Sequence, residues 1–170
     1  MMYTTQYMSP LGNMLLAADA RGLTGAWFEG QTYFARSLDT QHQERETSVL
    51  TDTKRWLDLY FRGMQPDFVP PLHPLGSAFQ QTVWEILLQI PYGHTTTYGE
   101  IARQIAQKQG ISRMSAPAVG GAVGHNPISI LIPCHRVKTG RLTGYAGGIE
   151  KKIQLLTLEK CDMHSFTIPK

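Results

Sequence analysis

Three consecutive residues, Cys134, His135 and Arg136, could carry out nucleophilic chemistry in this sequence. They follow an apolar run that ends at Pro133, so we expect the thiol to lie at the edge of a core. A cysteine thiolate is a strong nucleophile, a histidine can accept its proton, and a nearby arginine favours the charged form. An alternative stays open at this point, because a cysteine without a disulfide is often only a small buried apolar residue.

A histidine that activates a nucleophile needs a further group to orient its imidazole ring. Acidic residues are scarce in this half of the chain, and none occurs between Lys108 and Lys138. Glu159, at the end of the last predicted helix, is therefore a candidate for orienting His135. Asn126 precedes a proline and could hold the loop before the cysteine through side-chain hydrogen bonds.

Metal chemistry is disfavoured by the spacing of the possible ligands. The two cysteines, Cys134 and Cys161, do not form a Cys-x-x-Cys pair, and the six histidines are scattered along the chain. This pattern is not that of a zinc site, and two cysteines do not make a disulfide scaffold.

The composition is that of an ordinary globular protein, since 42% of the 170 residues are hydrophobic and 17% are charged. No apolar stretch approaches the length that spans a bilayer, and the first ten residues lack the basic and apolar regions of a secretory signal. We therefore expect a cytoplasmic protein. The net charge of +3 permits an anionic partner without requiring one.

The first part of the chain is predicted to form an α/β domain, a small sheet with a helix, over residues 1–76. Apolar stretches at 13–20 and 22–28 are typical of a β-hairpin. Residues 48–63 predict a helix, because apolar side chains recur on one face and a glycine can end it. The residues of that face are Leu50, Leu57, Tyr60 and Phe61, and the glycine is Gly63.

A proline-rich segment follows, with four prolines within residues 64–76. Such a segment cannot be the interior of a helix or a central strand, so we interpret it as the linker between two domains. The second domain, residues 77–170, is predicted to be mainly helical.

Two capping boxes mark helix starts in this second domain. Ser77 is followed three residues later by Gln80, and Thr97 is followed in the same way by Glu100. Apolar residues recur at helical spacing after each cap. After the first cap they are Phe79, Val83, Ile86, Leu87 and Ile90, and after the second they are Ile101 and Ile105.

A third helix is predicted from Ser115, with Pro117 in its first turn, where proline is tolerated. This helix consists almost entirely of alanine, valine and glycine, so its backbone can approach another surface closely. Together with the helix that starts at Thr97, it suggests a helix-turn-helix.

A buried strand or extended run over residues 127–133 is then expected to deliver Cys134 at its end. Residues 149–160 predict a final helix. Its inward residues are expected to be Ile149, Ile153 and Leu156, and its outward residues Lys151 and Lys152.

The motif "PCHRV", preceded by "NPISILI" and followed by "GYAGG", resembles the active-site signature of the alkylguanine-DNA alkyltransferases, also called methylated-DNA–protein-cysteine methyltransferases. The similarity continues upstream through "FQQTVWEILLQIPYGHTTTYGEIA" and "AVGGA", and so covers residues 79–159. The N-terminal part matches less distinctively, through its hairpin and "LYFRG".

The resemblance implies a DNA repair enzyme that is consumed by its own reaction. A helix-turn-helix would enter the minor groove of double-stranded DNA, and the damaged guanine would be flipped into a pocket. The alkyl group of O6-alkylguanine, and also of O4-alkylthymine, would pass to Cys134 in a single turnover. The resemblance implies no cofactor, no metal, no membrane and a monomeric protein.

The resemblance also assigns roles to individual residues. Cys134 would accept the alkyl group, His135 would act as its base through a water, and Glu159 would orient His135. Asn126 would be a hinge that binds backbone near the cysteine, and Tyr98 would help to rotate the nucleotide and assist guanine as a leaving group. The expected pocket residues are Tyr145, Ala146 and Gly147, and the expected DNA-binding residues are Arg113, Pro117, Ala118, Gly121, Ala122 and Arg136.

Two positions depart from the family's pattern. Pro117 stands where the family usually has an arginine that fills the gap left by the flipped base. Either Arg113 reaches in from a longer turn between the helices, or Pro117 itself acts as an apolar wedge. Ala146 stands where some relatives have serine, which predicts tolerance of adducts larger than methyl.

Two other functions remain open from the sequence. One is an alkyltransferase-like protein that recognises damaged DNA without repairing it, although such proteins lack the acceptor cysteine that this chain has as Cys134. The other is a thiol hydrolase unrelated to DNA, which would turn over repeatedly.

Overall fold

The computed structural model describes residues 1–138 and 145–161. The chain forms two compact units. The first consists of Met1–Leu75 together with Pro127–Leu131, and the second of Gly76–Asn126 and the chain from Ile132 onward. Division near residue 76 was expected, but residues 127–131 were not expected in the first unit.

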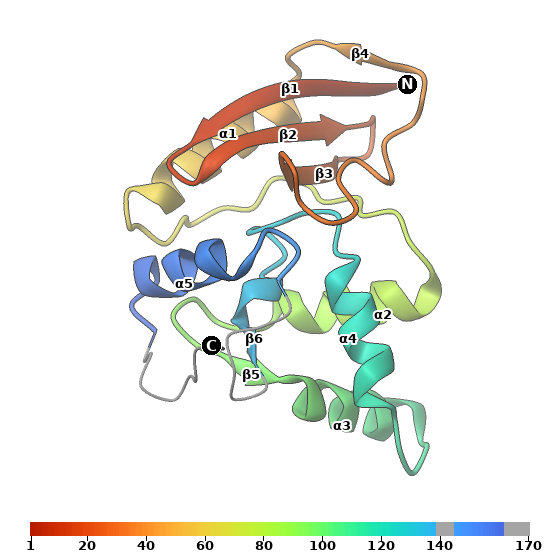
Figure 1. Ribbon diagram of the computed structural model, residues 1–170. Coiled ribbons are helices and arrows are strands. Elements are labelled where there is room, and N and C mark those ends of the chain that lie inside the picture. Colours follow the sequence, from red (N-terminus) through yellow and green to blue (C-terminus); the bar gives the residue numbers. More distant parts are fainter. Residues whose placement is uncertain (139–144, 162–170) are drawn as a thin grey trace. The chain divides into compact units, whose positions relative to one another are not determined.

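A four-stranded sheet with the strand order β3-β2-β1-β4 forms the first unit (Figure 1). β1 (Met2–Ser9) and β2 (Gly12–Ala18) pair antiparallel through a tight turn, and β3 (Leu23–Phe28) pairs antiparallel with β2. The β2–β3 pair is the predicted hairpin. The short β4 (His42–Glu44) runs parallel to β1, and neither β1 nor β4 was predicted.

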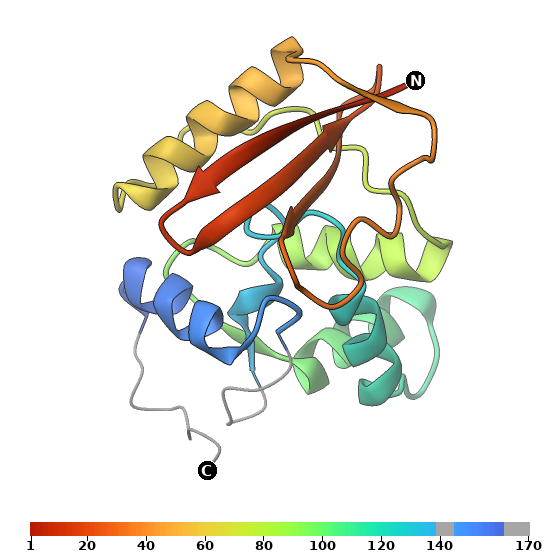
Figure 2. The same ribbon diagram turned by 45° about the horizontal axis from the view of Figure 1, so that its top comes forward.

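Helix α1 (Ser48–Phe61) packs against this sheet (Figure 2). Thr47 caps its N-terminus by accepting a hydrogen bond from the backbone N–H of Leu50. Gly63 has a φ of 82° just beyond its C-terminal end, a conformation that favours glycine. The buried face differs from the prediction in three places, because Thr53 and Trp56 are buried and Phe61 is only half-buried.

The outer edge of β3 is covered by other parts of the chain, which protects its unpaired backbone groups. Leu23 donates its backbone N–H to the Pro71 carbonyl at 2.8 Å and accepts from the His73 N–H at 2.7 Å. The segment interpreted as the linker at the end of the first domain therefore also pairs with the edge of β3. Gly22 permits the close approach, since a side chain there would lie 2.5 Å from the Pro71 oxygen.

Four helices dominate the described part of the second unit (Figure 1). They are α2 (Ala78–Leu88), α3 (Tyr98–Gln109), α4 (Ala116–Gly124) and α5 (Ile149–Leu158). A two-stranded parallel pair, β5 (Thr96–Thr97) with β6 (Val137–Lys138), joins distant parts of the sequence and was not predicted.

The predicted helix caps are present with one difference. Ser77 and Gln80 form the full capping box, and Ser115 accepts from the backbone N–H of Ala118 at 3.2 Å. Thr97 caps α3, but the Glu100 side chain binds Arg103 instead of completing the box. In the described ranges, we find no helix with the length and apolar character needed to cross a membrane.

Candidate active site

Two tight turns, not a strand, lead to Cys134. The N–H of Leu131 donates to the Ser129 carbonyl at 2.9 Å across Ile130, whose φ is 74°. This is a γ-turn with a positive central φ, a rare and strained form, and a β-branched residue there is an outlier. An inverse γ-turn follows at Pro133, with φ −83° and ψ 66°. The run is buried as predicted, but only Ile128 makes a β-bridge.

The Ile132 carbonyl accepts two hydrogen bonds that hold the second turn in place. It accepts the N–H of Cys134 at 2.8 Å and the side-chain amide of Asn126, also at 2.8 Å. Asn126 is buried, so this bond ties the C-terminal end of α4 to the residue two positions before the cysteine. The hinge role implied by the resemblance stays a prediction, but the side chain is placed as that role requires.

Cys134 starts the short 3₁₀-helix η1 (Cys134–Arg136) and is 6% exposed. Burial raises the pKa of its thiol. The side chain of Asn126, the charge of Lys152 and the backbone N–H groups of Cys134 and His135 act in the opposite direction. The resting group is therefore a thiol, in a site already equipped with groups that stabilise the thiolate.

A buried ion-pair network extends from His135. Its Nε2 lies 2.6 Å from Oε2 of Glu159, and Arg136 donates from Nε to Oε1 of the same carboxylate at 2.7 Å. The backbone N–H of Gly93 adds a third donor to Glu159 at 3.2 Å. These contacts compensate a carboxylate that is buried at the C-terminal cap of α5, where the helix dipole disfavours an acid.

The charges of this network follow from its pKa shifts. Burial would raise the pKa of Glu159, but hydrogen bonds from His135 and Arg136 outweigh burial, together with the charge of Arg136 and that of His135 when it is protonated at acidic pH. They lower the pKa to about 2. Burial lowers the pKa of His135, so its ring is neutral near pH 7. The ionised Glu159 is then balanced mainly by the permanent charge of Arg136.

This arrangement selects the tautomer of His135. A neutral ring whose Nε2 contacts a carboxylate carries its proton on Nε2 and donates it to Glu159. Nδ1 is then a proton acceptor, and it is buried without a hydrogen-bond partner among the described residues. A base with its acceptor atom available is what activation of a thiol requires.

The prediction that Arg136 binds DNA is not supported by its position. The side chain is buried, and besides its bond to Glu159 it donates from Nη1 to the Ile90 carbonyl at 2.8 Å. Its guanidinium is held in the interior by the buried carboxylate of Glu159, which requires a charged partner. Arg136 therefore belongs to the buried ion-pair network around Glu159.

Lys152 was predicted to point outward, and this was wrong. Its side chain is fully buried and donates from Nζ to the Val137 carbonyl at 2.7 Å. Burial lowers the pKa of Lys152 to about 8, and the charge that remains acts on Cys134. Helical spacing could have revealed the burial of Lys152, because residues 152, 155, 156 and 159 share one face of the helix and all are buried.

Two tyrosines accompany the cysteine and histidine. Tyr98, the first residue of α3, is half-buried, and burial together with the charge of Cys134 raises the pKa of its hydroxyl, which stays protonated. Tyr145 is buried and meets the His135 ring edge to face, with centroids 6.4 Å apart. Ala146 and Gly147 follow it, half-buried, just before α5.

The predicted DNA-binding residues of α4 divide into two groups. Pro117, Ala118 and Gly121 are exposed on one side of the helix. Ala122 is buried, and its carbonyl accepts a hydrogen bond from Nε1 of Trp84 at 2.9 Å, so the assignment of Ala122 to the DNA surface was wrong. Its backbone instead joins α4 to α2.

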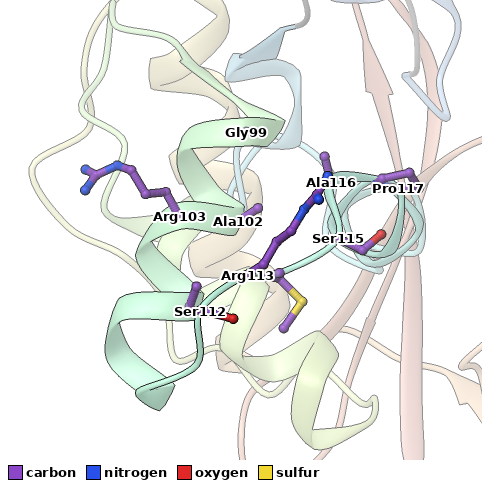
Figure 3. Close-up of a pocket in the computed structure, with 10 residues that line it drawn as sticks. Gly99, Ala102, Arg103, Ser112, Arg113, Ser115, Ala116 and Pro117 are labelled. Carbon is purple, nitrogen blue, oxygen red and sulfur yellow. The ribbon is translucent and has the colours of Figure 1, made fainter.

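A hollow of about 680 Å³ lies between α3 and the start of α4 (Figure 3). Arg113, from the connection between the helices, is exposed, and its side chain extends toward the first turn of α4 at Ala116 (Figure 3). Arg103 points away from that turn and is paired with Glu100 at 2.6 Å. Arg113 thus lies near the N-terminal end of α4, and its role in filling the gap left by a flipped base stays a prediction.

Comparison with known proteins identifies the group to which this site belongs. A family model described as "6-O-methylguanine DNA methyltransferase, DNA binding domain" matches residues 78–161. A second model, the ribonuclease-like domain of the same methyltransferase, matches residues 2–74. The chain belongs to the 6-O-methylguanine DNA methyltransferase family.

Relatives in this family match nearly the whole chain. A Haemophilus influenzae methylated-DNA–protein-cysteine methyltransferase is 42% identical over 162 residues, which are 94% of this chain and 87% of the relative. A Mycobacterium tuberculosis protein of the same name is 44% identical over 154 residues, 89% of this chain and 88% of its own length. These matches confirm the resemblance found in "PCHRV" and the residues around it.

Solved structures of the 6-O-methylguanine DNA methyltransferase family share the fold. The crystal structure of Mycobacterium tuberculosis OGT in complex with DNA matches with a TM-score of 0.80 and 41% identity, over 93% of this chain and 92% of that one. The predicted fold, a small sheet domain and a helical domain, is confirmed by this similarity and by the two family models.

No cluster of three or more histidine, cysteine or acidic side chains that could hold a metal occurs within residues 1–138 and 145–161.

Proposed function

We propose that this protein repairs alkylated double-stranded DNA as a monomer, by transferring the alkyl group from the O6 atom of guanine to Sγ of its own Cys134. The observation that carries the proposal is the buried His135–Glu159 pair, whose histidine directly follows Cys134 in the same short helix. The buried cysteine is flanked by a neutral imidazole whose acceptor nitrogen is available. The names and DNA complex of the relatives support a DNA substrate.

The reaction begins with loss of the thiol proton. His135 accepts it at Nδ1, through a water, and the resulting imidazolium is stabilised by Glu159, which lies 2.6 Å from Nε2. Asn126 and Lys152 stabilise the thiolate, opposing the burial that raises the pKa of Cys134. Because burial keeps the pKa of Cys134 high, most of the resting protein carries the thiol and is protected from unwanted alkylation.

Transfer then forms a carbon–sulfur bond and breaks the bond between the alkyl carbon and O6. The electron pair of the broken bond stays on guanine, whose negative charge is relieved by a proton. The Tyr98 hydroxyl, which stays protonated when the thiolate forms, donates a hydrogen bond to the leaving guanine. The proton that His135 took from Cys134 passes through water to guanine, so the His135 ring becomes neutral again. The product is a thioether on Cys134, and nothing in the network can hydrolyse it, so each molecule reacts once.

DNA would be bound through the exposed residues of α4 and the connection before it. Gly121 and Ala118 allow the helix backbone to approach a narrow groove, and Pro117 and Arg113 stand at the end where a flipped base leaves a gap. Support for a role of Arg113 comes from its exposed side chain, which extends toward Ala116 in the first turn of α4 (Figure 3). We therefore favour Arg113 over Pro117 as the residue that fills the gap.

Tyr145, Ala146 and Gly147 would line the pocket for the flipped base. Alanine at 146 removes a hydroxyl that a serine would supply, which enlarges the pocket and makes it less polar. Adducts larger than methyl should then compete well. Competition between oligonucleotides with methylguanine and with a larger alkylguanine tests this, and a strong preference for methyl would oppose it.

The stoichiometry of repair tests the function as a whole. Increasing amounts of an oligonucleotide with O6-methylguanine are incubated with a fixed amount of protein, and repaired guanine is counted. We expect repair to stop at one guanine per protein molecule. A thiol hydrolase would continue beyond this limit. Binding without any repaired base would favour a recognition protein, an alternative that the relatives do not favour.

A further inference from the structure

Residues 127–131 are held by the edge of the N-terminal sheet, although they lie only a few positions before the nucleophile. Ala26 of β3 donates its N–H to the Pro127 carbonyl at 2.8 Å and accepts the N–H of Ser129 at 2.9 Å. Ile128 thereby pairs with Ala26 as a parallel bridge. The chain re-enters the second unit at Ile132, two residues before Cys134.

Gln31 adds a side-chain contact to this attachment. It is buried at 8% exposure, and its Oε1 accepts the Phe28 N–H at 2.7 Å and the Ser129 hydroxyl at 3.4 Å. Its own N–H donates to the Phe28 carbonyl at 3.2 Å, which closes the turn at the end of β3. A polar side chain so well buried is fixed by its bonds, and one of them reaches the segment before the nucleophile.

The same segment contains the strained γ-turn at Ile130. Such a conformation persists only when the surrounding structure holds it in place. Ala26 and Gln31 hold the residues on its N-terminal side, and Asn126 binds the Ile132 carbonyl on its C-terminal side. The path of the backbone into Cys134 is therefore determined from both ends.

We propose that the N-terminal domain positions the nucleophile, with Gln31 as a positioning residue that holds the turn at Ser129 and Ile130 and, through it, Cys134. This rests on the proposed function, because it treats Cys134 as the alkyl acceptor. The side-chain hydrogen bonds of Gln31 join Phe28, Thr32 and Ser129, so its effect on Cys134 is transmitted through residues 129–134. Small displacements of a reacting atom reduce rates strongly, so the effect on transfer should exceed the effect on folding.

The test compares Gln31→Ala with Thr5→Ala in the full-length protein. Thr5 is a matched control, because it is as buried as Gln31 and lies in the same unit. Its hydroxyl donates to Glu46 at 3.0 Å, a residue of the first part of the chain and not of the segment 127–131. Transfer from O6-methylguanine DNA is followed in a single turnover at saturating DNA, at a temperature where circular dichroism shows each variant folded.

We expect Gln31→Ala to lower the rate constant roughly tenfold while the final amount of transfer stays complete. A merely structural defect would instead lower the final amount. Thr5→Ala should leave the rate constant unchanged. Equal rate constants for Gln31→Ala, Thr5→Ala and the unmodified protein would overturn the proposal.

A second measurement does not depend on transfer. Amide hydrogen exchange of peptides that span residues 127–134 should be faster in Gln31→Ala than in Thr5→Ala. If the unmodified protein transfers no methyl group, the proposed function is wrong, and the exchange rates still decide the positioning role. Unchanged exchange over residues 127–134 in Gln31→Ala would contradict that role.

Discussion

The side chain of Lys152 is fully buried and donates a hydrogen bond from Nζ to the backbone carbonyl of Val137 at 2.7 Å. Val137 directly follows η1, the short helix that begins with Cys134. The bond therefore holds the positive charge of Lys152 next to the C-terminal end of that helix. The charge lowers the pKa of Cys134 against the larger, opposite effect of burial. A lysine is thus kept inside the protein at a cost in stability, beside the group whose ionised form it favours.

Replacing Lys152 by methionine should slow transfer. Loss of the charge raises the pKa of Cys134 further, and each pKa unit reduces the thiolate fraction about tenfold at a pH below that pKa. We expect a decrease of roughly tenfold in the single-turnover rate constant, partly recovered as the pH is raised. Lys151→Met is the control, because Lys151 is only half-buried. Equal rates for both variants would exclude this role.

The same substitution should change how stability depends on pH. Burial lowers the pKa of Lys152 from 10.5 to about 8, so between these values the folded state binds fewer protons than the unfolded state. Stability contributed by this group therefore rises with pH across that window, by up to roughly 3 kcal/mol. Urea unfolding on either side of this pH window should show the rise in the free energy of unfolding for the unmodified protein and not for Lys152→Met. If Lys152 were solvated, the two proteins would show the same pH dependence.

Glu159→Gln should damage both chemistry and stability. The variant leaves Arg136 buried without its counter-charge, which typically costs about 3–5 kcal/mol, and His135 loses the carboxylate that orients it. The unmodified protein should also lose up to roughly 3 kcal/mol as the pH falls from 4.5 to about 2, because the pKa of Glu159 is depressed in the folded state. Acid unfolding measured by circular dichroism should show this loss, and Glu159→Gln should lack it.

A matched control for this prediction lies on the same helix. Glu150, in the first turn of α5, is exposed, so Glu150→Gln should keep the transfer rate and the acid transition of the unmodified protein. If Glu150→Gln and Glu159→Gln behaved alike, the buried network would have no special part in either property.

At position 130 a glycine variant should be more stable than an alanine variant, which is the reverse of the usual order. Glycine within a regular backbone is less stable than alanine by roughly 0.5–1 kcal/mol, but at a φ of 74° alanine is the strained residue. We expect Ile130→Gly to be as stable as Ile130→Ala or more stable by about 1 kcal/mol. Ile128, equally buried, is the control and should show the usual order. Urea unfolding of the four variants would refute the strained turn if both positions preferred alanine.

Arg113→Ala should weaken repair of duplex DNA more than Arg103→Ala. Both arginines line the hollow beside α4, but Arg103 is already paired with Glu100, whereas Arg113 extends toward the first turn of α4. Loss of one stacking or phosphate-binding arginine typically costs about 1–3 kcal/mol, so repair at limiting DNA should fall roughly tenfold. An unchanged rate in Arg113→Ala would leave Pro117 as the residue that fills the gap.

The sequence was informative where chemistry and local structure depend on neighbouring residues. The motif around Cys134 indicated the nucleophile, its histidine and the family, and the caps at Ser77 and Ser115 indicated where helices begin. These features need only the side chains of a short segment. Glu159 was also anticipated, although its 2.6 Å contact with His135 joins residues 24 positions apart, because few other acids were available.

The sequence misled where a residue's place depends on distant backbone. Apolar residues 128–132 have the composition of a strand, but β3 pairs with only one of them and the rest turn tightly. Arg136 and Lys152 carry charges typical of a surface, and they are buried because Glu159, Ile90 and Val137 offer them partners from other segments. Partners from distant segments cannot be predicted from the residues next to Arg136 and Lys152.

The most direct test of the account is the mass of the protein after reaction with O6-methylguanine DNA. We predict a gain of one methyl group in the intact protein, located on the peptide that contains Cys134. Cys161 is an internal control, because it is also buried and burial raises the pKa of its thiol to about 11. Cys161→Ser should react as the unmodified protein does, and Cys134→Ser should gain no mass. A methyl group on any other residue, or repair of the guanine with no gain in protein mass, would contradict the account.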